Sequence, residues 1–232
     1  MLNYQDFGLK KDNLYEVIAT TYSYQQENKA IQPNASCMGI RIIEGGQIQI
    51  SPFYSTTTYK NLEDYNIITI NFVDNVYLYA LAALKDSKSP IGLTDFPSKY
   101  YSFKHLKSRS MDVPYITNSW GIIVGKVSHE FQKTRRDDLG EIMIPVFILD
   151  IIFTERFQES NKLFNRAENL ALETIILATR LKVANQNQNK TQFIQIHKKI
   201  VDHIENIEKF GKNKNALKAI ELINDYINKL ID

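Results

Sequence analysis

Two different periodicities divide the chain. Up to about Glu155 the apolar residues come in short runs rich in β-branched and aromatic side chains, which is typical of strands. After Phe157 they recur every three or four positions, the spacing of one face of an α-helix. The pattern therefore predicts an α+β protein that is mainly β, with a β domain over residues 1–157 and a helical domain over residues 158–232.

Turn signals indicate how the predicted strands pair. Gly45 and Gly46 separate the runs CMGIRIIE and QIQIS, and such glycines are typical of a two-residue hairpin turn with positive φ. The charged segment KTRRDDLGE separates SWGIIVGKVSHEFQ from IMIPVFILDIIFTERF, which predicts two long neighbouring strands. Residues 85–113 show neither periodicity, so they are expected to form either a binding loop or a surface excursion.

The C-terminal pattern predicts three helices. Their segments are NKLFNRAENLALETIILATRL, TQFIQIHKKIVDHIENIEKF and NALKAIELINDYINKL. The second carries an apolar stripe on one face, formed by Phe193, Ile196, Ile200, Ile204, Ile207 and Phe210. Helices of this kind bury their stripes against one another, so a small three-helix bundle is expected.

Composition narrows the possible partners and the location. The 28 Lys and Arg residues nearly balance 26 Asp and Glu, so the net charge of +2 does not favour nucleic acid as a partner. The lone Cys37 excludes an intrachain disulfide and any multi-cysteine metal site. No apolar run is long enough to span a membrane, and the first residues lack the order of a signal peptide. We expect a cytoplasmic protein without a membrane partner.

Specific catalytic and metal motifs are absent from the sequence. There is no Gly-x-Ser-x-Gly, Walker loop, His-Glu-x-x-His or Gly-x-Gly-x-x-Gly. His197 and His203 lie six positions apart on a predicted helix, roughly 240° around its axis, so they do not share a face. We therefore expect no metal site, and no residue is singled out as catalytic.

A run of hydroxyl residues opens one predicted helix. In SPFYSTTTYKNLEDY, Ser55, Thr56, Thr57 and Thr58 precede the helical pattern. Free N–H groups and partial positive charge at a helix N-terminus attract anions, and neighbouring hydroxyls would complete an anion pocket. The alternative is that one threonine caps the helix while the others favour the preceding strand.

Two further segments place polar residues at strand ends. NASCMGI puts Asn34 and Ser36 at the start of a strand, where Gly39 indicates either close approach by a ligand or a bulge. ITINFVDN puts Asn71 at the end of a strand, where its amide would bind a ligand or close a turn.

The order of these segments, LYEVIATTYS, NASCMGI, STTTYKNL, NIITINFVDN and NRAENLALETIILATRL, resembles the largely archaeal DUF447 family of FMN-binding split-barrel proteins. The resemblance includes Arg166 and Arg180 of the helical tail, but the family's Ala-Pro-Met-Gly pattern is replaced by Ser36, Cys37, Met38 and Gly39. It implies a homodimer of six-stranded FMN-binding split β-barrels, each with a C-terminal three-helix bundle.

The same resemblance implies the cofactor and the residues that contact it. Thr56, Thr57 and Thr58 would hold the phosphate with help from Asn61; Ser36, Met38 and Gly39 would border the isoalloxazine; Asn34 and Asn71 would bond its polar rim. Tyr100, Tyr101 and Phe103 make residues 85–113 a candidate cover for the flavin.

The resemblance leaves three functions open. The chain is expected to be a flavin reductase-like oxidoreductase that uses NAD(P)H or another small electron donor or acceptor, with an unknown substrate. The alternatives are an FMN-binding or carrier protein without turnover, and a scaffold whose helical tail docks a partner.

Overall fold

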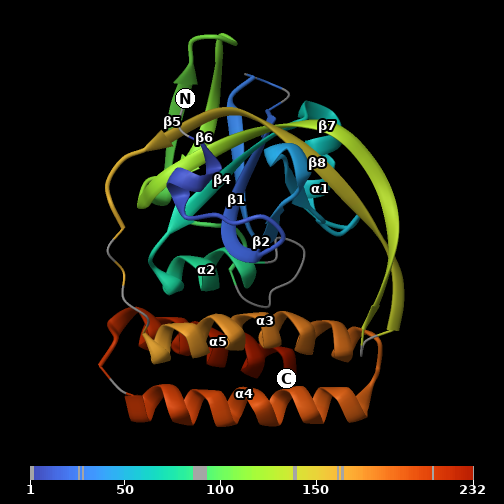
Figure 1. Ribbon diagram of the computed structural model, residues 1–232. Helices are drawn as coiled ribbons and strands as arrows, with labels where there is room; N and C mark the ends of the chain where they lie inside the picture. The colour runs from blue at the N-terminus through green and yellow to red at the C-terminus, as the bar shows by residue number, and fades with distance from the viewer. Residues whose placement is uncertain are drawn as a thin grey trace. The chain divides into compact units, whose positions relative to one another are not determined.

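The computed structural model describes residues 3–25, 27, 29–85, 93–137, 140–160, 162, 165–210 and 212–231 (Figure 1). The chain forms two compact units, Met1–Asp74 with Ser98–Ser160, and Asn75–Pro97 with Asn161–Asp232. The segment VYLYALAA belongs to the second unit, where it forms an apolar helix that packs with the C-terminal helices.

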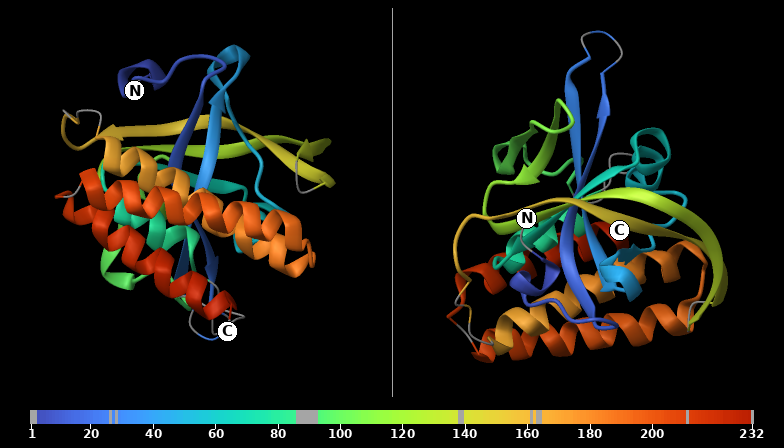
Figure 2. Two further views of the ribbon diagram at one scale, coloured as in Figure 1. Left: turned by 90° about the horizontal axis from the view of Figure 1, so that it is seen from below. Right: turned by 45° about the horizontal axis from the view of Figure 1, so that its top comes forward.

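The first unit is built around a closed antiparallel barrel of six strands (Figures 1 and 2). Its order around the barrel is β1-β2-β3-β8-β7-β4, and pairing of β4 with β1 closes it. The strands are β1 (Leu14–Tyr24), β2 (Ile31–Ile42), β3 (Ile48–Ile50), β4 (Ile67–Val73), β7 (Ser119–Asp137) and β8 (Gly140–Arg156). The predicted antiparallel pairing is confirmed.

Alternating side chains fill the barrel. Residues directly opposite each other in an antiparallel pair project to the same face, so Val17 and Met38 point into the core together. The same parity places Ala19 beside Ser36, and Thr21 beside Asn34, on the inward face. The polar residues of β2 thus lie on the same face as its apolar core residues, near one end of the strand.

The link between β2 and β3, which contains Gly45 and Gly46, differs from the prediction. Gly45 and Gly46 have φ values of 77° and 76°, as expected. However, the last registered pair is Ile42 with Ile48, so the link has five residues and contains the short 3₁₀ turn η2 (Glu44–Gly46). The prediction of a two-residue turn is wrong: the N–H of Ile43 donates to the carbonyl of Gln47 at 2.9 Å, so the three residues Glu44–Gly46 form the turn between them.

Two short helices accompany the barrel. The 3₁₀ helix η1 (Tyr4–Phe7) places the ring of Phe7 against Phe72, with centroids 5.0 Å apart. A Cβ atom at Gly121 would lie 2.7 Å from that ring, so only glycine permits this packing. The helix α1 (Thr57–Tyr65) lies between β3 and β4 in the sequence and buries Leu62 in the barrel core.

Residues 85–113 contain more regular structure than predicted. Residues 86–92 lie outside the described part of the chain, and the rest includes η3 (Ser98–Tyr100), β5 (Tyr101–Leu106) and the start of β6 (Met111–Ile116). β5 and β6 pair as an antiparallel hairpin. The sequence pattern of this hairpin is weak because it buries only a few side chains. Among them, Leu106 and Val113 join a second apolar cluster with Tyr22, Ile67 and Val124.

The second unit is helical. It consists of α2 (Val76–Ala83), α3 (Arg166–Gln186), α4 (Lys190–Phe210) and α5 (Lys214–Ile231), with α2 and α4 both packed against α3. The three C-terminal helices are confirmed, and so is the predicted fold class of a barrel with a C-terminal helical bundle. Among the described residues, no helix has the length and apolar character needed to cross a membrane.

Candidate functional site

Thr56, within the hydroxyl run, is the N-cap of α1. Thr56 precedes the helix in an extended conformation, and its Oγ1 accepts a hydrogen bond from the N–H of Tyr59 at 3.2 Å. The same hydroxyl donates to the carbonyl of Phe53 at 2.7 Å. Thr56 is therefore the capping residue that the sequence left open, and its hydroxyl both donates and accepts a hydrogen bond within this turn.

Thr58 lies at the centre of a buried polar cluster. Its side chain is 1% exposed. Its Oγ1 accepts from Asn34 Nδ2 at 3.1 Å and shares a hydrogen bond with Ser36 Oγ at 2.8 Å. The hydroxyl therefore faces the barrel strands, so it fastens the helix to β2 and points away from solvent.

Asn61 extends the same cluster by one helical turn. Its Nδ2 donates to Thr21 Oγ1 at 3.0 Å, and Asn34 Nδ2 reaches the same oxygen at 3.4 Å. The side chains of Thr21 and Asn61 are 0% and 3% exposed. The structure thus brings together four of the predicted site residues, Asn34, Ser36, Thr58 and Asn61, and adds Thr21, which no sequence pattern had singled out.

Exposed donors remain at the start of α1. Ser55 and Thr57 are exposed. Helix geometry gives the N–H groups of Thr57 and Thr58 no acceptor within the helix, because intrahelical acceptors lie four residues back. The N–H of Lys60 already bonds to the Thr56 carbonyl. This end of α1 therefore presents hydroxyl and amide donors, with partial positive charge from the helix.

Aromatic and basic side chains border this helix end. Tyr54 packs edge-on against Tyr59 with centroids 4.9 Å apart, and Phe53 and Tyr54 are 44% and 38% exposed. The guanidinium of Arg135, from β7, lies over the Phe53 ring at 5.9 Å. Because β7 is far from α1 in sequence, no local pattern indicated this arginine.

Tyr59 is tied to the middle of the same helix. Its hydroxyl donates to Glu63 Oε1 at 2.7 Å, and that hydrogen bond, together with burial and the nearby carboxylate of Glu130, raises the pKa of the phenol above its ordinary value. The hydroxyl therefore stays protonated over the physiological pH range, and Tyr59 donates a hydrogen bond to Glu63 one turn further along the helix.

Met38 and Gly39 do not face the same side of β2. Consecutive strand residues point to opposite faces, so Met38 lies in the barrel core at 7% exposure while Gly39 lies on the outer face. A Cβ at Gly39 would approach Leu14 Cδ1 at 3.1 Å and Glu16 Oε1 at 3.5 Å, so its close neighbours are side chains of β1. The register of β1 with β2 is unbroken there, so Gly39 marks no bulge.

Asn71 lies on the outer face of β4, apart from the cluster around Thr58. Its Oδ1 accepts from the N–H of Ile116 at 2.7 Å. Its Nδ2 donates to the carbonyls of Ile18 and Thr69 and to Thr20 Oγ1. The buried amide therefore joins β1, β4 and β6, and it docks the β5–β6 hairpin onto the outside of the barrel.

The β5–β6 hairpin packs near the opposite end of α1 from the exposed hydroxyls. Tyr65, at the C-terminal end of α1, stacks on Tyr22 at 5.4 Å and joins the apolar cluster that contains Leu106. The nine residues of α1 span about 13 Å. Of the proposed cover residues, Phe103 is 50% exposed. The structure does not place the hairpin beside Thr57.

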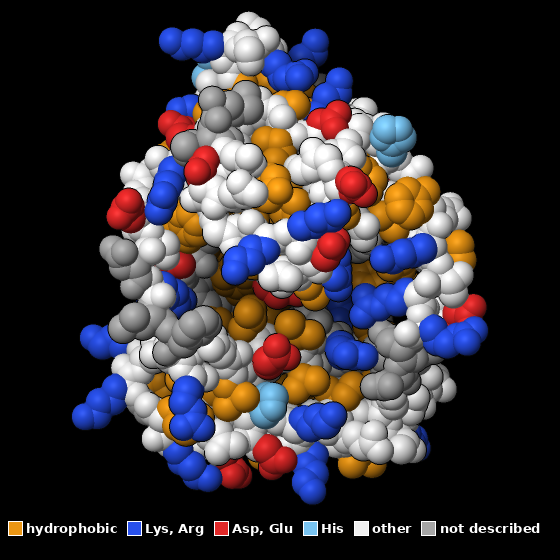
Figure 3. All heavy atoms as spheres, in the orientation of Figure 1, with side chains coloured by type: hydrophobic (Ala, Val, Ile, Leu, Met, Phe, Trp, Pro, Cys, Tyr) orange, Lys and Arg blue, Asp and Glu red, His pale blue; other side chains and the backbone are white. Residues whose placement is uncertain are grey.

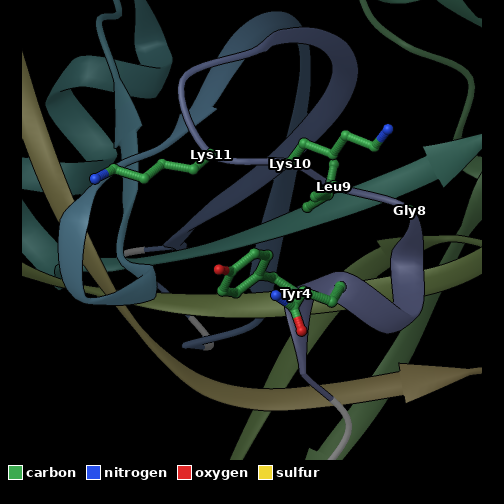
Figure 4. A pocket seen from close by; sticks show the side chains of 6 residues that line it. Tyr4, Gly8, Leu9, Lys10 and Lys11 are labelled. Carbon is green, nitrogen blue, oxygen red and sulfur yellow. The ribbon is translucent and has the colours of Figure 1, made fainter.

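No group of three or more His, Cys, Asp and Glu side chains among the described residues is arranged to hold a metal. A cavity of about 370 Å³ lies at the N-terminal segment, lined by Tyr4, Gln5, Gly8, Leu9, Lys10 and Lys11. Figure 4 shows the side chains of Lys10 and Lys11 pointing away from each other, so their charges do not converge on one ligand.

Charges of both signs are spread over the face seen in Figure 3, where Asp and Glu side chains lie among Lys and Arg. Together with the net charge of +2, this mixture of charges on the face shown does not favour a phosphate polymer as a partner. A single phosphate needs no such surface, because one helix N-terminus and a few donors suffice.

Comparison with known proteins identifies a related family and fold. Residues 15–111 match the model described as protein of unknown function (DUF447) N-terminal domain. The crystal structure of an FMN-bound DUF447 protein from Methanosarcina mazei has 18% sequence identity and a TM-score of 0.68, and the match covers 97% of this chain and 100% of that chain. A search of the curated proteins found no match.

Two flavoproteins show weaker similarity. Flavoredoxin of Desulfovibrio vulgaris (Miyazaki F) has 18% identity and a TM-score of 0.43, covering 61% of this chain and 70% of its own. The styrene monooxygenase flavin reductase of Pseudomonas putida S12 has 12% identity and a TM-score of 0.42, covering 61% and 81%.

Proposed function

We propose that the protein binds FMN and uses it as a flavin reductase-like oxidoreductase, a proposal supported by the match of residues 15–111 to the DUF447 N-terminal domain model. The observation that carries the proposal is the shared fold, over 97% of this chain, with an FMN-bound DUF447 protein. The donor set at the start of α1 fits the phosphate of that cofactor.

The phosphate end of FMN is proposed to lie at the N-terminus of α1. Thr57 and Ser55 supply exposed hydroxyls, and the first-turn N–H groups point in the same direction. Thr56 keeps the turn before the helix in shape. Asn34, Ser36, Thr58 and Asn61 support the site by fixing α1 on the barrel. Asn71 and Met38, which are bonded or buried elsewhere, are not proposed as direct ligands.

A bound flavin would supply hydride or electron transfer, while the chain holds and orients it. The donors at α1 would fix the phosphate and thereby the position of the ring system along the barrel. Phe53 and Tyr54 offer apolar surface beside the same helix end, where they would exclude water from the neighbouring part of the ligand. No described residue is assigned as a catalytic acid or base.

The first test is the absorption spectrum of the purified protein, followed by titration of flavin-free protein with FMN and with riboflavin. We expect visible absorption from bound oxidised flavin, quenching of FMN fluorescence on titration, and tighter binding of FMN than of riboflavin because riboflavin lacks the phosphate. A colourless protein that binds neither flavin would contradict the proposal.

Turnover is tested separately from binding. We expect NAD(P)H to bleach the flavin absorption of the loaded protein, with reoxidation by a small-molecule acceptor. Slow or absent bleaching by either nicotinamide, with FMN binding intact, would favour the alternative of a non-catalytic FMN-binding or carrier protein. The barrel fold by itself does not discriminate between these two functions.

A homodimer is proposed as the assembled form. Phe131 and Ile142, which lie on the same face of the β7–β8 pair, are 48% and 51% exposed. Exposed apolar side chains gathered on one hairpin are typical of surfaces buried by a partner, and a two-fold interface would bury the same patch from both protomers.

A further inference from the structure

The helix α4 buries few of its residues. Of its 21 residues, only Ile196, Ile200 and Ile207 are buried, and the helical period places them on one side, where α4 packs against α3. Figure 1 shows α3 and α5 on the same side of α4. The opposite side of α4 therefore faces away from the other described helices of this unit.

Apolar side chains also lie on this outer side of α4. Ile194 is 67% exposed, the highest value among the large apolar side chains of the described residues, and Val201 is 41% exposed. The two lie seven positions apart, close to two helical turns, so they share one face. The half-buried His197 and Ile204 have the same spacing and border that face. These four residues form an outer strip with the heptad spacing of helices that pair with another helix.

The charges beside the outer strip change sign at Val201. Lys198 is exposed before this point, and Glu205 and Glu208 are exposed after it. No ion pair with another described residue involves Lys198 or Glu205. Glu208 lies in the last turn of α4, where the helix dipole disfavours an anion, so its position is not explained by the stability of the helix.

We propose that the outer strip is a self-association surface, at which the α4 helices of two copies of this chain pack antiparallel about a two-fold axis. The midpoint between Lys198 and Glu205 falls beside Val201. An axis there places Lys198 of each copy beside Glu205 of the other, and Val201 of both copies at the centre of the contact. A parallel pair would instead place like charges side by side, which is unfavourable.

Pairing through α4 requires no flavin, so it is independent of the proposed function. It also uses a different surface from the proposed dimer contact on β7 and β8, since α4 belongs to the helical unit. A contact with so few apolar side chains is of the weak class, so we expect association through α4 at about 0.1 mM and above, rather than at micromolar concentration.

Charge reversal tests the pairing, by sedimentation equilibrium of the full chain up to about 0.5 mM. Every chain carries Phe131→Glu, so that pairing through β7 and β8 does not contribute. We expect Lys198→Glu and Glu205→Lys each to weaken dimerisation by about tenfold, because each brings like charges together at two symmetric places. The two substitutions combined should restore it. Lys199→Glu, an exposed position about 100° further around α4, is the matched control and should leave dimerisation unchanged.

Disulfide formation tests the orientation of the helices, in chains that carry Cys37→Ser and are otherwise wild type. Val201→Cys should form a disulfide-linked dimer under mild oxidation, because the axis brings the two copies of this residue together. Ile194→Cys, on the same face and more exposed, should not, since antiparallel pairing separates its two copies by about 20 Å along the helices. Parallel pairing would link both variants.

Three results would overturn the proposal. One is a Phe131→Glu chain that stays monomeric at about 0.5 mM. Another is a pair of single charge reversals that associate like their background, or whose combination does not restore association. The third is linking of Ile194→Cys as readily as of Val201→Cys. None of these results bears on FMN binding, which the flavin titrations measure separately.

Discussion

At the residue scale, adjacent hydroxyls of one short run have different roles. Thr56 caps α1, Thr57 is exposed, and Thr58 is buried against Asn34 and Ser36. The difference follows from helix geometry, since neighbouring positions are rotated by about 100°. Only the structure reveals which of the three faces the barrel.

Thr57→Ala and Thr58→Ala are expected to act on different properties. Thr57→Ala should weaken FMN binding by about threefold to tenfold and leave riboflavin binding and unfolding unchanged, since one exposed donor to the phosphate is lost. Thr58→Ala should lower the free energy of unfolding by about 1 to 3 kcal/mol, because it removes the buried hydroxyl that bonds to Asn34 Nδ2 and Ser36 Oγ. Chemical denaturation and flavin titration measure the two effects. Equal behaviour of the variants would contradict the division.

The pH dependence of stability provides a test at Tyr22. Burial, followed by the neighbouring Tyr24, raises the pKa of Tyr22 from 10.0 to about 12. Below pH 10 the phenol is neutral in both states, whereas between about pH 10 and about pH 12 the unfolded chain loses the proton more readily. The contribution of this group is thus present at neutral pH and is lost as the pH rises through that window.

Tyr22→Phe should therefore reduce the loss of stability at high pH. The measurement is the urea midpoint at about pH 9 and at about pH 11, and the difference between these midpoints should be smaller in the variant than in the wild type. Tyr54→Phe, at an exposed position, is the control. An identical pH difference in Tyr22→Phe and wild type would show that Tyr22 does not titrate in this window.

At the element scale, single polar side chains connect elements distant in sequence. The buried cluster of Thr21, Asn34 and Thr58 fixes α1 on β1 and β2, and Asn71 fixes the β5–β6 hairpin on the outer face of β4. A buried amide without a hydrogen-bond partner costs free energy, so the amides of Asn34 and Asn71 favour the one arrangement of strands and helix in which they are bonded.

Asn71→Leu should loosen the β5–β6 hairpin. The substitution removes the acceptor for the Ile116 N–H, and an unpaired buried N–H costs about 1 to 3 kcal/mol. We expect lower stability to urea and faster amide hydrogen exchange over Tyr101–Ile116, with little change in α3 to α5. Asn206→Leu, at an exposed amide of α4, is the control. Unchanged exchange in the hairpin would contradict the docking role.

At the scale of the whole molecule, the long β7–β8 pair contributes to more than one structure. The half that contains the start of β7 and the end of β8 pairs with β4 and β3 and so closes the barrel, which buries Ile123 and Phe147. In the described part of the far half, β7 and β8 pair with each other, and exposed apolar side chains lie beside Arg135. Most apolar residues of these two strands are thus buried within the protomer, and the exposed ones form the proposed dimer surface.

Sedimentation at micromolar concentration should give the mass of a dimer. Phe131→Glu should shift the protein toward the monomer, because it places a charge in an apolar contact. The control is Gln132→Glu, which adds a charge on the opposite face of the same strand. A monomeric wild type would contradict the proposed assembly, and so would a Phe131→Glu variant that stays dimeric.

The sequence by itself determined the class of fold and the order of its parts. Period-two and period-3.6 patterns report burial on one face of a strand or helix, so the long strands of β7 and β8 and the three C-terminal helices were predictable. The family resemblance indicated the cofactor, and the run from Ser55 to Thr58 indicated which helix end to consider. These features depend on neighbours in the sequence.

Only the tertiary structure decided which residues meet. Thr21 joins the cluster of Thr58, Arg135 lies over Phe53, and Asn71 turns to the outer face of the barrel. Strand register fixes these choices, because a shift of one residue moves every side chain to the opposite face. Local patterns do not encode register between segments as distant as β7 and α1, so the geometry of the site required the closed barrel.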